Sequence, residues 1–216
     1  MINEDFSKLG SDMLKIIEFL RVARKLQVTY RFTPKPDNEF ESDADHSWSV
    51  ALICMLLASR LEKELGISIN QLKMIKMAII HDMAEIETGD TRTWDAKARI
   101  DKEQKERKAF YDMTEILPED LKLEFRDLWE ECEARKTIEA KIVKSIDRLD
   151  PVLHRTFFEV GWKDISGNDG TVSALDERQL PRHEFSEVLT LLYTSVRDEA
   201  IHEGLFNLKS DESSQE

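Results

Sequence analysis

The stretch M-A-I-I-H-D-M-A-E-I-E-T-G-D, from Met77 to Asp90, decides how the rest of the chain is interpreted. Apolar residues recur here at steps of three and four together with His81 and Glu85, which predicts that all of them share one helical face. Asp82 lies about 100° further around the same turn. The glycine before Asp90 suits the left-handed position after a helix end, so Asp90 is expected on the exit turn. Because an unpaired buried carboxylate is costly, this face indicates a bound cation.

The composition predicts one all-α domain. The chain has 216 residues, which is enough for a full core, and contains few glycines (7) and prolines (5). Long runs with a 3.6-residue apolar period favour helices throughout. We expect a single domain over residues 1–207 and a disordered acidic tail over residues 208–216.

The charge and the cysteines restrict the partners. The formal net charge of −13 disfavours non-specific binding to nucleic acid or to an anionic membrane, but not a small phosphorylated ligand, because a bound cation reverses the local field. Cys54 and Cys132 lie inside helical patterns, as expected for buried thiols in a reducing compartment. The chain shows neither a leader pattern nor an apolar run of about 18 residues, so we expect a cytoplasmic protein without membrane contact.

The periodic segments predict seven helices joined by loops. The expected helices are Phe6–Leu26, Asp43 or Asp45 to Glu64, Ser68 or Asn70 to Glu87, Lys97–Ile116, Pro118–Lys136, Ile138–Val160, and Arg182 or His183 to Leu205. Three segments are predicted as loops or connectors because of their prolines, glycines or polar residues: Thr33–Ser42, Thr91–Ala96 and Gly161–Leu180.

A basic cluster closes the first predicted helix. Its cations suit the negative end of a helix dipole, which is a purely structural interpretation. The functional interpretation is a positive rim that holds phosphate oxygens, and the candidates for that role are Arg24, Lys25 and Arg31.

Two polar residues outside the opening stretch are predicted to face the core. His46 lies on the inward side of the second helix in its first turn, and Asp147 lies beside the apolar stripe of the helix that starts at Ile138. Each alone has an ordinary interpretation, as a hydrogen-bonded core histidine or a salt-bridged boundary carboxylate. Consecutive helices joined by a short turn pack antiparallel, which is expected to bring His46 close to the end of the helix that carries His81.

The inward polar residues together predict a metal site. His46, His81, Asp82 and Asp147 offer two imidazoles and two carboxylates, a set that suits one divalent transition metal ion such as Mn, Co, Ni, Zn or Fe. An ion with open positions lowers the pKa of bound water from about 15.7 towards neutrality. Glu85, one turn beyond His81, is placed to orient or deprotonate that water, or to protonate a leaving group.

The spaced set H…HD…D resembles the HD-domain metal-dependent phosphohydrolases. The local sequences E-S-D-A-D-H-S-W (Glu41–Trp48), H-D-M-A-E-I-E-T-G-D (His81–Asp90) and A-K-I-V-K-S-I-D (Ala140–Asp147) are similar to the branch that contains 5′-deoxynucleotidases, over roughly residues 10–160. The resemblance implies a bundle of about six to eight helices, a mononuclear metal site with the four ligands above, and a homodimer. It also implies hydrolysis of (deoxy)ribonucleoside 5′-monophosphates to nucleoside and phosphate.

The resemblance further implies roles for two acids. The catalytic glutamate of the family matches Glu85, and its acid after the Thr-Gly pair, which contacts the sugar and assists catalysis, matches Asp90.

Two departures from the family pattern concern the substrate pocket. An arginine-tryptophan pair of the family falls in the region Arg24–Gln27, which has no tryptophan, and the proline expected after the Gly-Asp pair is replaced by Thr91–Trp94.

Two other functions stay open. The same site is compatible with a phosphodiesterase or diphosphohydrolase, or with oxygenation at a dinuclear iron centre. A dinuclear centre needs extra histidines, and the remaining ones, His154, His183 and His202, have no clear inward spacing. A non-catalytic regulatory module with a structural metal is the third possibility, against which the presence of Glu85 and Asp90 argues.

Overall fold

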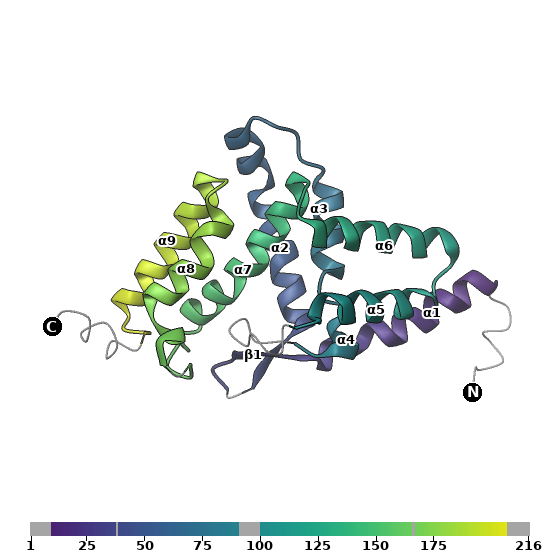
Figure 1. Ribbon diagram of the computed structural model, residues 1–216, viewed down its shortest axis with the longest axis horizontal. Helices are drawn as coiled ribbons and strands as arrows, with labels where there is room; N and C mark the ends of the chain where they lie inside the picture. Colours follow the sequence, from purple (N-terminus) through teal and green to yellow (C-terminus); the bar gives the residue numbers. More distant parts are fainter. Residues whose placement is uncertain (1–9, 38, 91–99, 166, 207–216) are drawn as a thin grey trace.

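Two consecutive helices and a third from much later in the chain pack against one another at the centre of the molecule (Figure 1). The computed structural model describes residues 10–37, 39–90, 100–165 and 167–206. The central helices are α2 (Asp43–Leu65), α3 (Gln71–Ile80) and α7 (Ile138–Phe157). Fully buried apolar side chains from all three form the main hydrophobic core.

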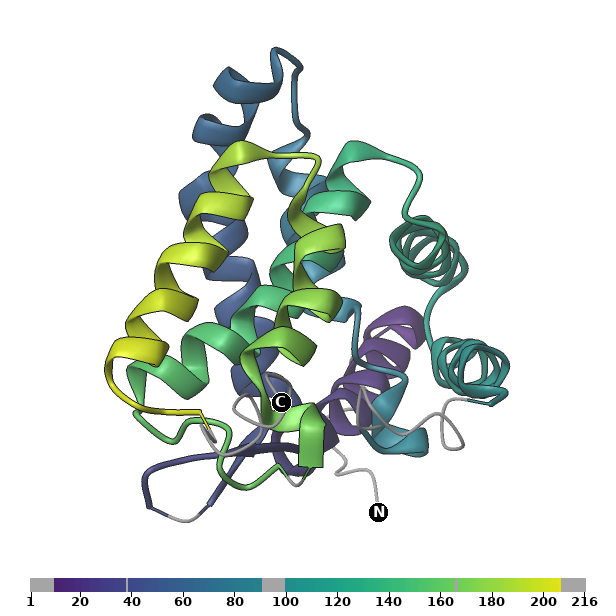
Figure 2. The ribbon, with the colours of Figure 1, turned by 60° about the vertical axis from the view of Figure 1, so that its left-hand side comes forward.

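The other helices flank this centre on two sides. On one side lie α1 (Ser11–Ala23), α5 (Lys102–Thr114) and α6 (Glu119–Ala134), and on the other α8 (Val172–His183) and α9 (Glu187–His202) (Figure 1). Figure 2 shows α5 and α6 end-on, on the side opposite to α8 and α9. The prediction of an all-α fold is confirmed. Within the described residues, no helix has the length and apolarity needed to cross a bilayer.

Helix α2 starts and ends close to where its sequence predicts. The Ser42 side chain accepts a hydrogen bond from the backbone of Asp45, whose side chain accepts in return from the backbone of Ser42. Gly66 takes the left-handed conformation that ends the helix, with φ of 66°. This capping fixes the first turn of α2, which places His46 with its side chain in the protein interior.

The next predicted helix is interrupted at the residues that decide the fold. A single helix to Glu87 is wrong, because α3 ends at Ile80 and a turn separates it from α4 (Glu85–Thr88). In that turn the backbone hydrogen bonds span three residues, as in Met83 N–H to Ile80 O, instead of four. His81 also donates to the Ala78 carbonyl at 2.8 Å. The tighter turn directs the side chains of His81 and Asp82 into the centre of the molecule.

Two short strands occupy half of the segment Thr33–Ser42, which was predicted as a loop. β1 (Tyr30–Pro34) pairs antiparallel with β2 (Phe40–Ser42), and Tyr30 lies opposite Ser42. Before β1, the first helix ends at Ala23, and the chain continues as the 3₁₀ segment η2 (Arg24–Val28).

The prediction of a loop over Gly161–Leu180 is wrong for most of its second half. Helix α8 occupies that half, after the short 3₁₀ segment η3 (Gly167–Gly170). The Thr171 side chain caps α8 by accepting from the backbone of Ala174 at 3.2 Å. The last helix therefore starts at Glu187 in α9, later than predicted.

Several predictions fall outside the described residues. They are the start of the first helix before residue 10, the connector Thr91–Ala96, residues 97–99 of the charged helix and the tail 208–216. The prediction for Ile138–Val160 is confirmed in its main part, because Thr137 caps α7 and the helix continues to Phe157.

Candidate metal centre and active site

The four predicted metal ligands converge from three separate parts of the fold. His46 comes from α2, His81 and Asp82 from the turn after α3, and Asp147 from α7. His46 Nε2 lies 3.2 Å from Asp147 Oδ1 and 3.6 Å from Asp82 Oδ2. His81 Nε2 lies 3.2 Å from Asp82 Oδ2 and 3.7 Å from Asp147 Oδ1. One ligand atom from each residue lies within 4.8 Å of all the others, which is compact enough for a single cation.

The hydrogen bonds of the two imidazoles fit a metal site. His81 Nδ1 faces the Ala78 carbonyl, which can only accept, so in the neutral ring Nε2 keeps its lone pair. That Nε2 atom is buried and has no hydrogen-bond partner within the described part of the chain. A histidine whose Nδ1 is held in this way and whose Nε2 points at carboxylates is the usual arrangement of a metal ligand. The residues present therefore fit a divalent ion of intermediate softness.

Asp150 contacts the candidate site and was missed by the sequence analysis. Its Oδ2 lies 2.7 Å from His46 Nδ1, and its Oδ1 accepts a hydrogen bond from the Ser49 hydroxyl. Asp150 follows Asp147 by one turn of α7, and that three-residue spacing is the signal that would have placed both on one face. Asp150 thus fixes the ring orientation of His46.

Burial and mutual attraction shift the pKa values of the four ligands in opposite directions. Burial alone would raise the pKa of Asp82 and of Asp147, but the imidazoles beside them lower it below the usual range. Burial and Arg31 lower the pKa of His46, but hydrogen bonds to Asp147 and Asp150 outweigh them and raise it to about 9. Protons and a cation therefore compete for the same imidazoles.

Glu85 lies beside this centre in an almost fully buried position, 4% exposed. Its Oε1 accepts from Lys102 Nζ at 3.2 Å, whereas Oε2 is buried and has no hydrogen-bond partner within the described residues. Burial and the nearby Asp82 carboxylate raise the pKa of Glu85 well above its usual value. Such a carboxyl group can hold a proton near neutral pH and release it to an adjacent atom.

A second acid that the sequence analysis did not select lies close by. Asp43, in the first turn of α2, is fully buried. Burial and the Asp82 carboxylate raise the pKa of Asp43 to about 7. Its Oδ1 lies 3.5 Å from Arg31 Nη1. Among the described residues, Arg31 is the ion-pair partner of Asp43.

Of the three basic candidates, only Arg31 reaches the centre. Its Nη1 lies 2.7 Å from Asp82 Oδ2, and only 13% of its side chain is exposed. Lys25 instead forms a surface ion pair with Glu87 at 3.7 Å, and Arg24 is exposed on η2. Strand β1 explains the difference, because it directs Arg31 inward. Asp90 is half-buried and lines the two cavities that open beside the centre.

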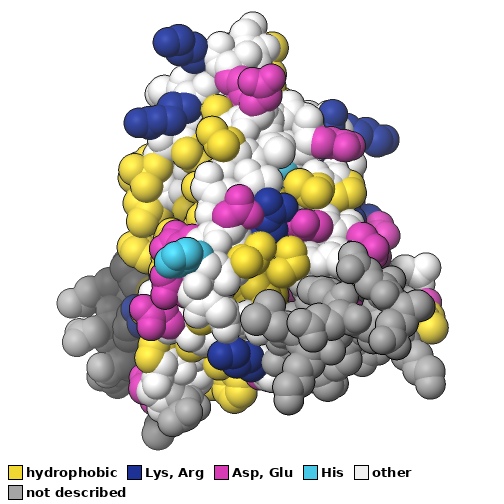
Figure 3. All heavy atoms as spheres, turned by 90° about the vertical axis from the view of Figure 1, so that its left-hand side faces the viewer, with side chains coloured by type: hydrophobic (Ala, Val, Ile, Leu, Met, Phe, Trp, Pro, Cys, Tyr) yellow, Lys and Arg dark blue, Asp and Glu magenta, His cyan; other side chains and the backbone are white. Residues whose placement is uncertain are grey.

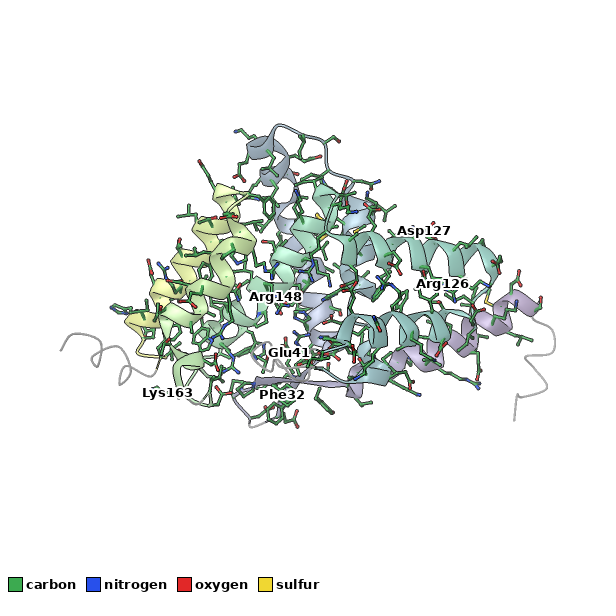
Figure 4. The ribbon with its side chains drawn as sticks, in the orientation of Figure 1. Phe32, Glu41, Arg126, Asp127, Arg148 and Lys163 are labelled. Carbon is green, nitrogen blue, oxygen red and sulfur yellow. The ribbon has the colours of Figure 1, made fainter. Side chains whose placement is uncertain are left out.

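Three cavities meet at Asp147 and Arg148. The largest has a volume of about 490 Å³ and an apolar wall that includes Pro151, Val152 and Trp162. A second, of about 240 Å³, contains Glu85 and several charged side chains. Figure 4 labels Arg148 near the middle of the molecule, above Glu41.

The remaining histidines, all within the described residues, do not join the centre. His154 lies between Glu41 and the Pro34 carbonyl, and His183 is bound by Ser145 and Gln179. His202 is exposed at the end of α9. The extra ligands that a dinuclear iron centre would take from histidine are thus engaged elsewhere.

The fold and the site define an all-helical protein with a cluster of two histidines and two aspartates that could hold a cation. A model of the HD domain matches residues 23–179, about three quarters of the sequence. The chain therefore belongs to the HD-domain family.

Individual relatives agree with this assignment. The chain is 34% identical to the 5′-deoxynucleotidase HDDC2 of Xenopus laevis over 156 residues, which are 71% of this chain and 72% of that protein. It is 31% identical to human 5′-deoxynucleotidase HDDC2 over 157 residues, 69% of this chain and 71% of that one. A solved structure described as a predicted metal-dependent phosphohydrolase, from Magnetospirillum magnetotacticum MS-1, is 33% identical with a TM-score of 0.78, covering 95% of this chain and 99% of that one.

Proposed function

We propose that this chain is a metal-dependent phosphomonoesterase that hydrolyses (deoxy)ribonucleoside 5′-monophosphates to nucleoside and phosphate. The observation that carries the proposal is the meeting of four ligand atoms within 4.8 Å, with Glu85 and Arg31 beside them. The names of the relatives from Xenopus laevis and human support the substrate class.

The proposed cofactor is one divalent transition metal ion per chain, Mn, Co, Ni, Zn or Fe, held by His46, His81, Asp82 and Asp147. Such an ion, when bound, acidifies water and offsets the charge of a phosphate group. Asp150 keeps the His46 ring in position for this role.

The chain's own residues would then bind phosphate and move protons. The Arg31 guanidinium, already at the centre, offers several N–H donors to phosphate oxygens. Glu85 would accept a proton from water at Oε2 and deliver it to the 5′-oxygen that leaves. Asp90, on the rim of the two cavities, is the proposed contact to the sugar.

The nucleoside would occupy the cavity that Trp162 and Asp147 line. Its volume of about 490 Å³ lies within the range of small-molecule sites, and Asp147 places it against the metal centre. The flat indole of Trp162 and the side chains of Pro151 and Val152 offer apolar surface to a base.

The decisive experiment is hydrolysis of a panel of nucleoside monophosphates, diphosphates and cyclic diesters with added Mn or Co, read by phosphate release and product mass. We expect release of phosphate and nucleoside from monophosphates, and loss of both bound metal and activity in Asp82→Ala. Asp127→Ala is a matched control because this carboxylate is exposed on α6 (Figure 4). Phosphatase activity retained in Asp82→Ala would contradict the proposal.

The assembly and setting are further parts of the proposal. We propose a homodimer of chains that each form one domain over residues 1–207, in the cytoplasm, without nucleic-acid or membrane partners. Large apolar side chains exposed on α2 (Trp48, Met55) and α9 (Leu191) support self-association. Figure 3 shows hydrophobic side chains gathered along one edge of the face formed by α8 and α9. Light scattering that gives the mass of one chain would contradict the dimer.

A further inference from the structure

A basic cleft that Trp162 does not line adjoins the metal centre and is not used by the proposed reaction. It has a volume of about 240 Å³ and lies between α7, the end of α6 and the end of α8. Five cationic side chains line it, against two acidic ones, Asp147 and Glu184; the cations are Arg135, Lys141, Lys144, Arg148 and Arg182.

This excess of cations is unusual for the chain that contains it. The formal net charge of the whole chain is −13, so cations gathered in one cleft oppose the average. Lys144 is neutralised by an ion pair with Glu133. Arg135 and Lys141, in contrast, form no ion pair with any described residue, and Arg135 Nε is buried without a hydrogen-bond partner. Such donors suit an anionic ligand.

The cleft is placed to share one small molecule with the metal centre. Lys141, Lys144 and Arg148 follow one another at steps of three and four, so they lie along one face of α7. At 1.5 Å per residue, Lys141 lies about 9 Å along the helix axis from Asp147, and Lys144 about 4.5 Å. Asp147 belongs both to the ligand set and to the wall of the cleft. A group at the metal centre and a group in the cleft can therefore belong to the same nucleotide.

We propose that this cleft binds a second phosphoryl group of the substrate, so that the chain prefers nucleotides with two phosphate groups over simple monophosphates. The identity of the phosphate that is cleaved rests on the proposed function, whereas anion binding in the cleft rests on its charges alone. With a nucleoside 3′,5′-bisphosphate, the water oxygen forms a bond to the 5′-phosphorus and the bond from phosphorus to O5′ breaks. The proton ends on O5′, and the 3′-phosphate is retained in the product. With a 5′-diphosphate, the same two bonds at the phosphorus next to O5′ form and break, so the products are nucleoside and pyrophosphate.

The kinetic test compares a nucleoside 5′-monophosphate with the corresponding 3′,5′-bisphosphate and 5′-diphosphate. We expect at least one of the doubly phosphorylated substrates to have a kcat/KM about tenfold to a hundredfold higher, mainly through KM, as for one charge-assisted contact. Lys141→Gln is expected to remove most of that advantage and Lys141→Glu all of it, with monophosphate hydrolysis unchanged. Lys163→Gln is the matched control, since Lys163 is an exposed lysine away from the cleft (Figure 4). Equal kcat/KM values for all three substrates overturn the proposal.

A binding measurement separates this inference from the proposed function. Pyrophosphate is titrated calorimetrically into the chelator-treated full chain, where turnover does not contribute. We expect binding that is weakened about tenfold or more in Lys141→Glu and in Arg135→Gln but not in Lys163→Gln. If the protein binds pyrophosphate in this way but hydrolyses no nucleotide, the anion-binding cleft is supported and the proposed phosphatase function is wrong. If pyrophosphate does not bind, or if neither cleft substitution changes its affinity, the proposed anion-binding cleft is wrong, even when monophosphates are hydrolysed.

Discussion

His46 shows how a single residue of the centre depends on a group outside the ligand set. Its Nδ1 lies 2.7 Å from Asp150, which leaves Nε2 directed at Asp82 and Asp147. A carboxylate in this position fixes the ring and raises the basicity of the coordinating nitrogen. The strength of the proposed metal site would therefore be set in part by a residue that does not touch the ion.

Replacing Asp150 tests this dependence. We expect Asp150→Ala to weaken metal binding by about tenfold to a hundredfold, since the His46 ring loses both its orientation and its partner. Competition with a chelating dye measures the change. Asp127→Ala, which removes an exposed carboxylate, should leave the affinity unchanged. An Asp150→Ala protein with the metal affinity of the parent would show that α2 alone fixes His46.

His183 gives the molecule an acid-sensitive point remote from the centre. The ring is fully buried between Ser145 and Gln179, and burial lowers the pKa of His183 to about 4. The unfolded chain, with a histidine pKa near 6.5, binds more protons between these values, so stability rises with pH across this window. We expect about 3 kcal/mol of stability to be lost as pH falls from about 6.5 to 4. Urea unfolding of the parent and of His183→Gln over this range measures it, and parallel profiles would contradict the assignment.

Individual site residues were predictable to different degrees. His81, Asp82 and Glu85 follow from a local pattern, because their spacing on one segment fixes their relative directions. Placing His46 required only that consecutive helices pack antiparallel, whereas Asp147, on a helix much later in the chain, was selected from its position beside an apolar stripe and from the family resemblance. Arg31, however, was indistinguishable from its basic neighbours, because a strand that no local pattern predicted decides its direction. Asp43 was missed for another reason, since buried acids at helix starts look like ordinary caps.

At the scale of secondary structure, the cap at the start of α2 helps to position residues of the candidate site. Ser42 and Asp45 form a reciprocal cap, and the hairpin β1–β2 ends at Ser42 itself. The strand that carries Arg31 and the helix that carries His46 are thus joined at one capped residue. Loosening this junction would disturb both functional side chains together.

Ser42→Ala is the corresponding test. Loss of the side-chain acceptor is expected to cost about 1 kcal/mol of folding stability, in the usual range for a helix cap, and to weaken metal binding through the first turn of α2. Chemical denaturation and metal titration measure the two effects. Ser173→Ala is the control, because Ser173 is exposed within α8. If the variant is destabilised but binds metal with unchanged affinity, the helix cap does not influence the metal site.

The elements that sequence reasoning failed to predict share a physical cause. Helix α8 has few apolar positions, and its buried residues include Gln179, so its period is weak in the sequence. The hairpin is short and partly exposed, and its prolines favoured a loop. The break between α3 and α4 arises where His81 bonds to Ala78, a side-chain contact that periodicity does not reveal. Long helices such as α2 and α7 were predicted because their apolar residues repeat with the 3.6-residue period of a helix over many turns.

At the scale of the whole molecule, the candidate metal centre lies where the three helices that share the main hydrophobic core come together. α2, the α3–α4 turn and α7 meet there, and α8 and α9 pack on α7 from the other side. Three of the four ligands are buried, and each carboxylate lies close to an imidazole. A cation held by all four residues would cross-link regions about a hundred residues apart in the chain, which ties function to global stability.

Removing the metal should therefore lower the thermal stability of the entire chain. An ion present at a hundredfold excess over its dissociation constant stabilises the native state by about 2.7 kcal/mol, provided that it does not bind the unfolded chain. For a domain of this size that corresponds to roughly 5–10 °C in Tm. We expect a chelator to lower Tm by this amount and added Mn or Co to restore it, measured by scanning calorimetry. Asp147→Asn removes the ligand that α7 contributes, so its Tm should respond to neither treatment, whereas Asp127→Asn should behave as the parent. If the chelator removes the metal from the parent protein but does not change its Tm, the three segments are stable together without the ion.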